Sequence, residues 1–220
     1  MIIQMNLQNL IHEIPTGVKL VVVSKTQPVQ TIRALYDSGQ RMFGENKVQE
    51  LVAKQPQLPG DIEWHFIGHL QRNKVKFIAP VTSLIHSIDS FKLLKEVNKE
   101  AEKICRKVNC LLQFHIASEE TKFGLDLEEA VSMLASPEYP ELKFVNICGV
   151  MGMATFTENQ ERVRQEFSHL HTVFQRLKET YFKESPDFKE LSMGMTNDYL
   201  VAIEEGSTML RIGSMIFSPG

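Results

Sequence analysis

The sequence has few cysteines, no long apolar run and no marked excess of charge of either sign. Its 3 cysteines are an odd number without the spacing of metal ligands, and the first residues lack the basic-then-apolar pattern of a secretory signal. These absences exclude a disulfide framework, give no metal site and favour a reducing, cytoplasmic compartment. Because no apolar run is long enough to cross a bilayer, we expect no membrane partner.

Charge and composition narrow the organisation further. A net charge of -3, from 24 basic and 27 acidic residues, gives no general attraction for nucleic acid or an anionic membrane. The 220 residues are 43% hydrophobic and contain no repeat, linker or low-complexity run. We therefore expect a single domain over residues 1–220, in which any anion-binding site is local.

Short apolar runs alternate with longer amphipathic ones along the chain. The longest amphipathic pattern has Val163, Phe167, Leu170, Phe174 and Leu177 at helical spacing, so it predicts a helix whose apolar stripe packs on another element. The predicted strands are Lys19–Val23, Arg41–Gly44, Glu63–Ile67, Leu84–Ile88, Cys110–Ile116, Phe144–Val150, Lys189–Met193 and Met209–Ile212. The predicted helices between them are Val29–Ser38, Lys47–Lys54, Arg72–Ile78, Phe91–Lys107, Leu127–Ala135, Asn159–Tyr181 and Asn197–Glu204.

This alternation predicts an α/β fold with a parallel sheet. Eight such strands in this length favour a closed, single-domain (β/α)8 TIM-type barrel, with an open, doubly wound sheet as the alternative. The chain stops at Gly220, too soon after the eighth strand for a full outer helix. We expect the amphipathic segment Ile3–Glu13 to cover that gap.

Unusual residues gather where the predicted strands end, which is the face on which barrel enzymes place their sites. A single lysine, Lys25, follows the first apolar strand, and Gly/Ser/Thr residues follow the seventh and eighth. Glycine lets the backbone approach an anion, while amides and hydroxyls donate to it, so these two strand ends form a candidate phosphate cradle. A lysine beside a phosphate cradle suggests pyridoxal phosphate (PLP). The other strand ends carry Glu45-Asn46, Gly68-His69, Ser87, Asp89 and Met151-Gly152.

Each of these features also has a plainer interpretation. A lysine after a strand is commonly a solvated rim residue, and a Gly-Ser pair is commonly an ordinary turn. Arg211 can be an ion-paired residue instead of a ligand contact. His65 and His115, which lie inside apolar runs, are better read as hydrogen-bonded core histidines than as catalysts.

Successive motifs together resemble the YggS/PROSC family of pyridoxal phosphate homeostasis proteins. The resemblance runs in order from about Leu20 to Phe217, and it is this shared order that makes it specific. The motifs are Val23-Ser24-Lys25, Phe43-Gly44-Glu45-Asn46-Lys-Val-Gln-Glu50, Trp64-His65-Phe66-Ile67-Gly68-His69-Leu70-Gln71, Ser87-Ile-Asp89, Glu120-Thr-Lys122-Phe-Gly124, Ser192-Met-Gly-Met-Thr-Asn-Asp198 and Gly206-Ser-Thr-Met-Leu-Arg211-Ile-Gly213.

The resemblance implies a barrel of PLP fold type III, related to the N-terminal domain of alanine racemase. Lys25 matches the family lysine that forms an internal aldimine with the cofactor. Arg211 matches the arginine that faces the pyridine nitrogen; because a guanidinium does not readily release a proton, it would keep that nitrogen unprotonated.

The remaining cofactor contacts also follow from the resemblance. Ser192, Gly213 and Ser214 match positions that bind the phosphate. Asn46 matches a pocket residue near the ring, and Met151 is expected to pack close to it.

The same resemblance implies a carrier of cofactor with little or no turnover. Racemases of this fold type have a second, mostly β domain that supplies further acid/base groups, and this chain has no room for one. We therefore expect no catalytic residues, a monomer, and a role in cytoplasmic vitamin B6 and amino-acid homeostasis, with PLP-dependent apoenzymes as candidate recipients. The alternatives are a compact PLP-dependent amino-acid racemase and a barrel that binds another phosphorylated metabolite.

Two histidines depart from the family pattern. His69 stands where proline is frequent, and His115 stands where asparagine is common. Both are expected near the mouth of the barrel, where either could add a titratable group.

Overall fold

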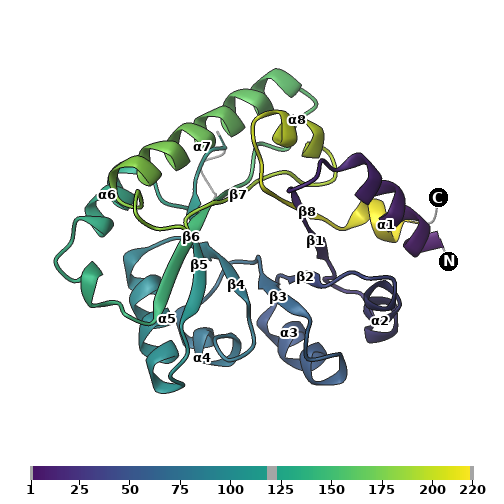
Figure 1. Cartoon of the computed structure of the whole chain (residues 1–220), viewed down its shortest axis with the longest axis horizontal. Helices are drawn as coiled ribbons and strands as arrows, with labels where there is room; N and C mark the ends of the chain where they lie inside the picture. The colour runs from purple at the N-terminus through teal and green to yellow at the C-terminus, as the bar shows by residue number, and fades with distance from the viewer. Residues whose placement is uncertain (1, 118–122, 219–220) are drawn as a thin grey trace.

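The computed structural model describes residues 2–117 and 123–218, and these form a closed barrel of parallel strands. Each strand pairs with the next along the chain, and β8 pairs with β1. Helices surround the strands, as Figure 1 shows. The strands are β1 Lys19–Val23, β2 Met42–Glu45, β3 Glu63–Phe66, β4 Leu84–Ile88, β5 Val108–Phe114, β6 Val145–Gly152, β7 Glu190–Ser192 and β8 Met209–Ile212.

Closure of the sheet decides between the two predicted architectures. Lys19 aligns with Met209 and Val22 with Ile212, so the first and last strands are joined along the whole of β8. The barrel prediction is confirmed, and an open sheet is excluded. Because all neighbouring strands are parallel, the carboxyl ends of all the strands lie at one mouth of the barrel.

The helices match the predicted segments with differences at their ends. The predicted helix Arg72–Ile78 opens with a 3-10 turn, and the predicted helix Phe91–Lys107 ends at Lys103 because Cys105 takes a left-handed conformation, with φ of 50°. The helices are α1 Ile2–Glu13, α2 Val29–Asp37, α3 Val48–Lys54, α4 Val75–Ile78, α5 Phe91–Lys103, α6 Leu127–Leu134, α7 Gln160–Thr180, α8 Tyr199–Glu204 and α9 Ser214–Phe217, with 3-10 turns at Gln55–Gln57, Arg72–Lys74 and Tyr139–Glu141.

The first helix covers the gap that the short C-terminal segment leaves. Asn6 of α1 donates a side-chain hydrogen bond of 3.1 Å to the carbonyl of Ile216 in α9. Tyr199 of α8 donates a 2.7 Å bond to the Glu13 carboxylate. α1 and α9 lie side by side in Figure 1, so the expected role of the N-terminal segment is confirmed.

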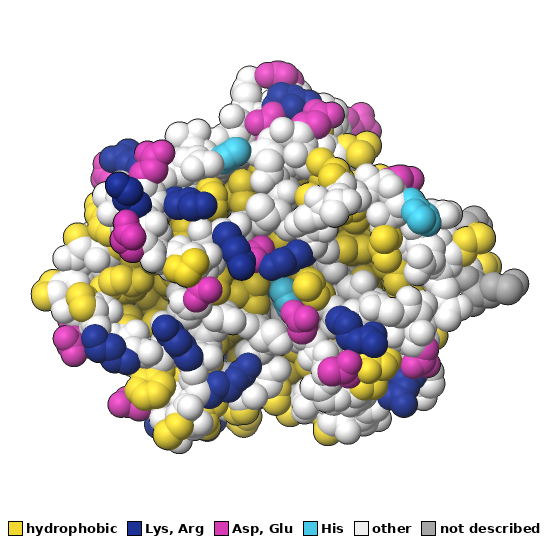
Figure 2. Space-filling model, in the orientation of Figure 1, with side chains coloured by type: hydrophobic (Ala, Val, Ile, Leu, Met, Phe, Trp, Pro, Cys, Tyr) yellow, Lys and Arg dark blue, Asp and Glu magenta, His cyan; other side chains and the backbone are white. Residues whose placement is uncertain are grey.

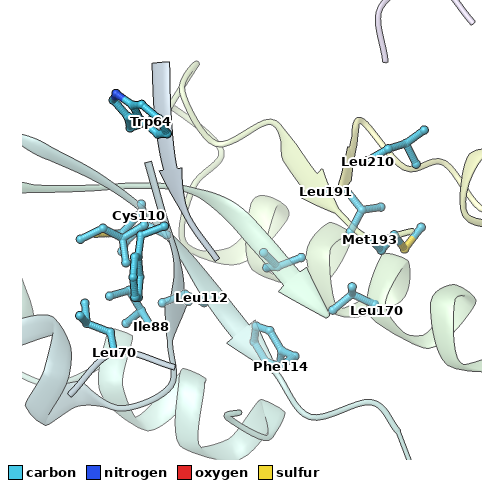
Figure 3. Close-up of a cluster of buried hydrophobic side chains, with 14 of the residues drawn as sticks. Trp64, Leu70, Ile88, Cys110, Leu112, Phe114, Leu170, Leu191, Met193 and Leu210 are labelled. Atoms are coloured by element: carbon cyan, nitrogen blue, oxygen red, sulfur yellow. The ribbon is translucent and has the colours of Figure 1, made fainter. Parts of the chain in front are cut away.

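Two apolar clusters hold the barrel. The larger one lies between strands and helices and includes Trp64, Leu112 and Leu191, which Figure 3 labels among its members. The smaller cluster comprises Val21, Leu84, Leu111, Cys148, Met151 and Met209. Among the described helices, none has both the length and the apolar character needed to span a membrane.

Candidate functional site

A cavity of about 490 Å³ opens where the strands end. It lies among the segments that follow β1, β2, β3, β6, β7 and β8, which is the face predicted for the site. Of the predicted cofactor residues, Lys25, Asn46, Arg211, Gly213 and Ser214 line it. The structure therefore brings together residues that are up to 189 positions apart in the sequence, from Lys25 to Ser214.

Lys25 projects into this cavity from a turn that is anchored on both sides. Before it, the Ser24 hydroxyl donates to Glu45 Oε1 at 2.7 Å; after it, the Thr26 amide donates to Glu50 Oε2 at 2.8 Å. No carboxylate in the described ranges forms an ion pair with Lys25 itself. The amine is thus fixed at its base and available to a ligand.

A second lysine, Lys54, braces the turn from behind. Its Nζ donates to Glu45 Oε1 at 2.8 Å, to Glu50 Oε2 at 2.9 Å and to the Ser24 carbonyl at 3.0 Å. Burial raises the pKa of the Glu45 carboxyl, while the bonds from Lys54 and Ser24 lower it. Because Lys54 is fully engaged there, Lys25 is the lysine of this turn that faces the cavity.

Arg211 forms the inner wall of the cavity and is 4% exposed. One guanidinium nitrogen donates to Ser192 Oγ at 2.6 Å, and the other donates to the Gly152 carbonyl at 2.9 Å. Burial lowers the pKa of Arg211 to about 10, partly opposed by the Asp198 carboxylate, so the group is charged at neutral pH. The cavity therefore contains a rigid, permanent donor.

The segments after β7 and β8 meet in the predicted phosphate cradle. The Ser214 hydroxyl donates to Thr196 Oγ1 at 2.9 Å, and Asp198 closes the turn by accepting from the Met195 amide at 2.6 Å. A Cβ at Gly213 would lie 2.8 Å from the Val23 carbonyl oxygen, so the backbone fits only without a side chain. Sequence reasoning missed Thr196, although the residue lies inside a motif that carried the resemblance.

The wall formed by β2 and β3 contains an unsatisfied acceptor. Asn46 Oδ1 is buried and has no hydrogen-bond partner among the described residues. Close packing fixes the backbone of Asn46, because a Cβ at Gly68 would lie 2.1 Å from the backbone carbonyl oxygen of Asn46. A buried polar atom without a partner favours a bound ligand that supplies one.

Two of the predicted contacts do not line the cavity. Ser192 points inside the barrel, where its hydroxyl accepts from Arg211 and lies 3.1 Å from His86 Nδ1. Met151 is 1% exposed and belongs to the smaller apolar cluster. Ser192 thus contacts the site from behind, through Arg211.

His69 forms part of the rim. Its Nδ1 lies 3.2 Å from Asp89 Oδ2, and its ring stacks on Phe123 with 3.9 Å between centroids. His115 is not part of the cavity lining, and its amide donates to the Leu125 carbonyl at 3.1 Å. The motif from Glu120 to Lys122 lies outside the described residues.

Comparison with known proteins identifies the family. The family model "Alanine racemase, N-terminal domain" matches residues 2–219. A pyridoxal phosphate homeostasis protein from Aquifex aeolicus is 41% identical over 201 residues, covering 90% of this chain and 86% of that protein. The chain belongs to the family of pyridoxal phosphate homeostasis proteins. A second family member, from Schizosaccharomyces pombe, is 36% identical and covers 91% of this chain and 84% of its own.

Solved structures agree with this assignment. PipY of Synechococcus elongatus with PLP bound is 33% identical, with a TM-score of 0.86 over 98% of this chain and 100% of that chain. Alanine racemase from Bartonella henselae shares the fold alone, at 15% identity and a TM-score of 0.74, over 99% of this chain and 58% of that chain. This chain therefore shares its fold with a part of the longer racemase.

Proposed function

We propose that this protein binds PLP covalently through Lys25, as an internal aldimine, and acts in vitamin B6 and amino-acid homeostasis with little or no turnover. The observation that carries the proposal is the position of Lys25. Its amine has no carboxylate partner among the described residues, and it lies in one cavity with a buried arginine and a hydroxyl cradle. When bound, PLP supplies an aldehyde that condenses with a primary amine. The PLP-bound structure of PipY supports this reading.

The residues of the cavity suit the parts of the cofactor. We assign Arg211 to the pyridine nitrogen, because its guanidinium is held by Ser192 and Gly152 and has no acceptor atom of its own. A donor that keeps its proton leaves the ring nitrogen unprotonated, which weakens the ring as an electron sink. This favours storage of the cofactor over reaction.

For the phosphate we assign the Ser214 and Thr196 hydroxyls together with the backbone at Gly213. These groups lie after adjacent strands, where barrel proteins bind phosphate. Ser192 was expected to be a phosphate ligand; we now propose that it supports Arg211 instead. Asn46 remains our candidate for a contact near the ring, since its buried Oδ1 needs a donor.

A compact amino-acid racemase is the second candidate, and the rim provides its specific support. Racemisation needs a second proton-transfer group, and His69, held by Asp89, lines the same cavity as Lys25. This alternative predicts turnover of an amino acid that both Lys25→Ala and His69→Phe abolish. Absence of turnover across the common amino acids would leave the carrier role.

The proposed setting is the cytoplasm, with the protein acting as a monomer and with PLP-dependent apoenzymes as candidate recipients. Support comes from the free cysteines, of which Cys110 and Cys148 are buried and unpaired. Thiols in this state fit a reducing compartment.

The visible spectrum of the purified protein during PLP titration tests the proposal. We expect a yellow absorption band that saturates at one cofactor per chain, is missing in Lys25→Ala and is unchanged in Lys47→Ala, a control on an exposed neighbouring lysine. A band that survives in Lys25→Ala, or no band in the native protein, would return the cavity to a site for another phosphorylated metabolite.

A further inference from the structure

A line of buried polar side chains crosses the barrel interior from the cofactor cavity to the opposite end. Arg211 donates to Ser192 Oγ at 2.6 Å, Ser192 Oγ lies 3.1 Å from His86 Nδ1, and His86 Nε2 lies 2.9 Å from His65 Nδ1. These residues come from β8, β7, β4 and β3. Each of them is at most 4% exposed.

The hydrogen-bond partners of Ser192 set the direction of the bonds in this line. A guanidinium can only donate, so Ser192 accepts from Arg211. Among the described residues, His86 Nδ1 is the one acceptor within reach of the Ser192 hydroxyl proton, so Ser192 donates to it. His86 then carries its proton on Nε2 and donates to His65 Nδ1, which in turn leaves the proton of His65 on Nε2. Burial lowers the pKa of His65 to about 3 and that of His86 well below its usual value, so both rings are neutral.

The line ends at a second cavity, of about 350 Å³, at the amino end of the barrel. His65 lines this cavity, and no described residue accepts a hydrogen bond from its Nε2. A side chain that is 3% exposed thus presents an N–H to the cavity, with no acceptor for it in the described part of the chain. The lining consists of Lys19, Met42, Glu63, His65, Ser83, Leu84, Asn109, Asn146, Cys148, Asp187, Lys189, Glu190 and Met209.

Most charges around this cavity are satisfied by the protein. Lys19 pairs with Glu190, whose other oxygen accepts from Thr208. Asp187 accepts from Asn146 at 3.1 Å. Burial raises the pKa of the Cys148 thiol to about 11, so it is neutral.

Two opposite charges are left. Among the described residues, neither the Lys189 amine nor the Glu63 carboxylate has an ion-pair or side-chain hydrogen-bond partner. Basic, acidic and histidine side chains gather near the middle of the face shown in Figure 2, in keeping with this lining. A ligand that carries one charge only would meet an unfavourable partner here, whereas a ligand with both charges would satisfy each.

We propose that the amino-end cavity is a second ligand site, which binds a small zwitterion of the α-amino acid class. Its carboxylate accepts from His65 Nε2–H and lies near Lys189, and its ammonium group lies near Glu63. The volume is at the lower end of the range for small-molecule sites, which suits a ligand of a few heavy atoms. The site is separate from the cofactor cavity and does not depend on PLP.

NMR of ¹⁵N-histidine-labelled protein tests the site. PLP-free protein is used, because an added amino acid could otherwise react with the cofactor. Long-range ¹H–¹⁵N correlations should show His65 and His86 neutral, with the proton on Nε2. Glycine should shift the His65 Nε2 signal saturably. Acetate should bind about two- to fivefold more weakly, since it lacks the exposed charge contact with Glu63. Methylammonium should bind more weakly than acetate, since it lacks both the contact with Lys189 and the hydrogen bond from His65. A proton on His65 Nδ1, or a His65 signal that glycine leaves unmoved, would overturn the proposal.

Surface variants locate the ligand's charges. Lys189 and Glu63 are exposed, so Lys189→Ala and Glu63→Gln should fold normally, which the unchanged His86 signals would verify. Each should weaken glycine binding about two- to fivefold, with Lys92→Ala as the control on a lysine outside the cavity. Equal glycine affinity in all three variants would contradict the assignment. A failure to bind PLP at Lys25 would leave these results unaffected, so the two proposals fail separately.

Discussion

Replacement of Lys54 by methionine tests how the turn that carries Lys25 is held. The substitution keeps most of the apolar stem but removes the amine that donates to Glu45, Glu50 and the Ser24 carbonyl. Glu45 is fully buried, and one of its oxygens already has no partner among the described residues. After the substitution its remaining hydrogen bond would come from the Ser24 hydroxyl.

The structure gives the size and the pH dependence of the effect. Breaking a buried ion pair by removing one partner costs about 3–5 kcal/mol in the free energy of unfolding. Burial raises the pKa of Glu45 in the folded protein above its value in the unfolded chain. The free energy of unfolding therefore falls as pH rises from the unfolded-state pKa through the folded-state pKa of this group. Lys54 lowers the pKa of Glu45, so Lys54→Met should raise that pKa further and extend upward the pH range over which stability is lost. We expect the variant to lose about 1–2 kcal/mol more free energy of unfolding at pH 8 than at pH 5.

Urea unfolding of the PLP-free protein at pH 5 and pH 8 measures this loss. Lys47→Ala serves as the control, because Lys47 is exposed and its nearest carboxylate is 4.0 Å away. Adding Glu45→Gln to Lys54→Met should restore part of the loss at pH 8, since no buried charge then remains. The reasoning is refuted if Lys54→Met costs the same at both pH values, or if Glu45→Gln gives no recovery.

Three further predictions follow from the site and its surroundings. Gly213→Ala should weaken PLP binding at least tenfold in an absorbance titration and lower the free energy of unfolding in urea by about 1–3 kcal/mol. The reason is that the new Cβ would lie 2.8 Å from the Val23 carbonyl oxygen. Unchanged PLP affinity would contradict the assignment of the phosphate cradle. Ser192→Ala should shift the absorption maximum of bound PLP and lower its affinity, whereas Ser192→Thr, which keeps the hydroxyl, should restore both; a spectrum identical to the native one would exclude support of Arg211. Cys105 should be the one thiol that reacts quickly with Ellman's reagent at pH 8. Cys110 and Cys148 are buried, and burial raises the pKa of both thiols. Reaction of all 3 cysteines at one rate would contradict this prediction.

Local patterns made the barrel predictable. A polar or glycine residue ends each strand or follows it within two residues, and a parallel barrel places all such ends at one mouth. Lys25, Arg211 and Ser214 could therefore be placed in one site from sequence position alone. The covering role of α1 also followed, because a barrel without an outer helix after β8 leaves an apolar face for another segment.

Other features depend on which face of a strand a side chain occupies. Leu191 and Met193 pack outside the barrel, so Ser192 between them points inward to Arg211 and not into the phosphate cradle. His65 and His86 are far apart in sequence from Ser192, and their alignment across the interior depends on barrel register, which hydrophobic periodicity does not give. The interpretation of His65 as a hydrogen-bonded core histidine is confirmed.

The central claim is that Lys25 holds the cofactor. The most direct test is to reduce the bond between PLP and the protein and to find which lysine carries it. Protein saturated with PLP would be treated with borohydride, digested and mapped by mass spectrometry. The account predicts the pyridoxyl phosphate mass on the peptide that contains Lys25, at about one per chain. Label spread over surface lysines, or concentrated on Lys54 or another single lysine, would contradict it.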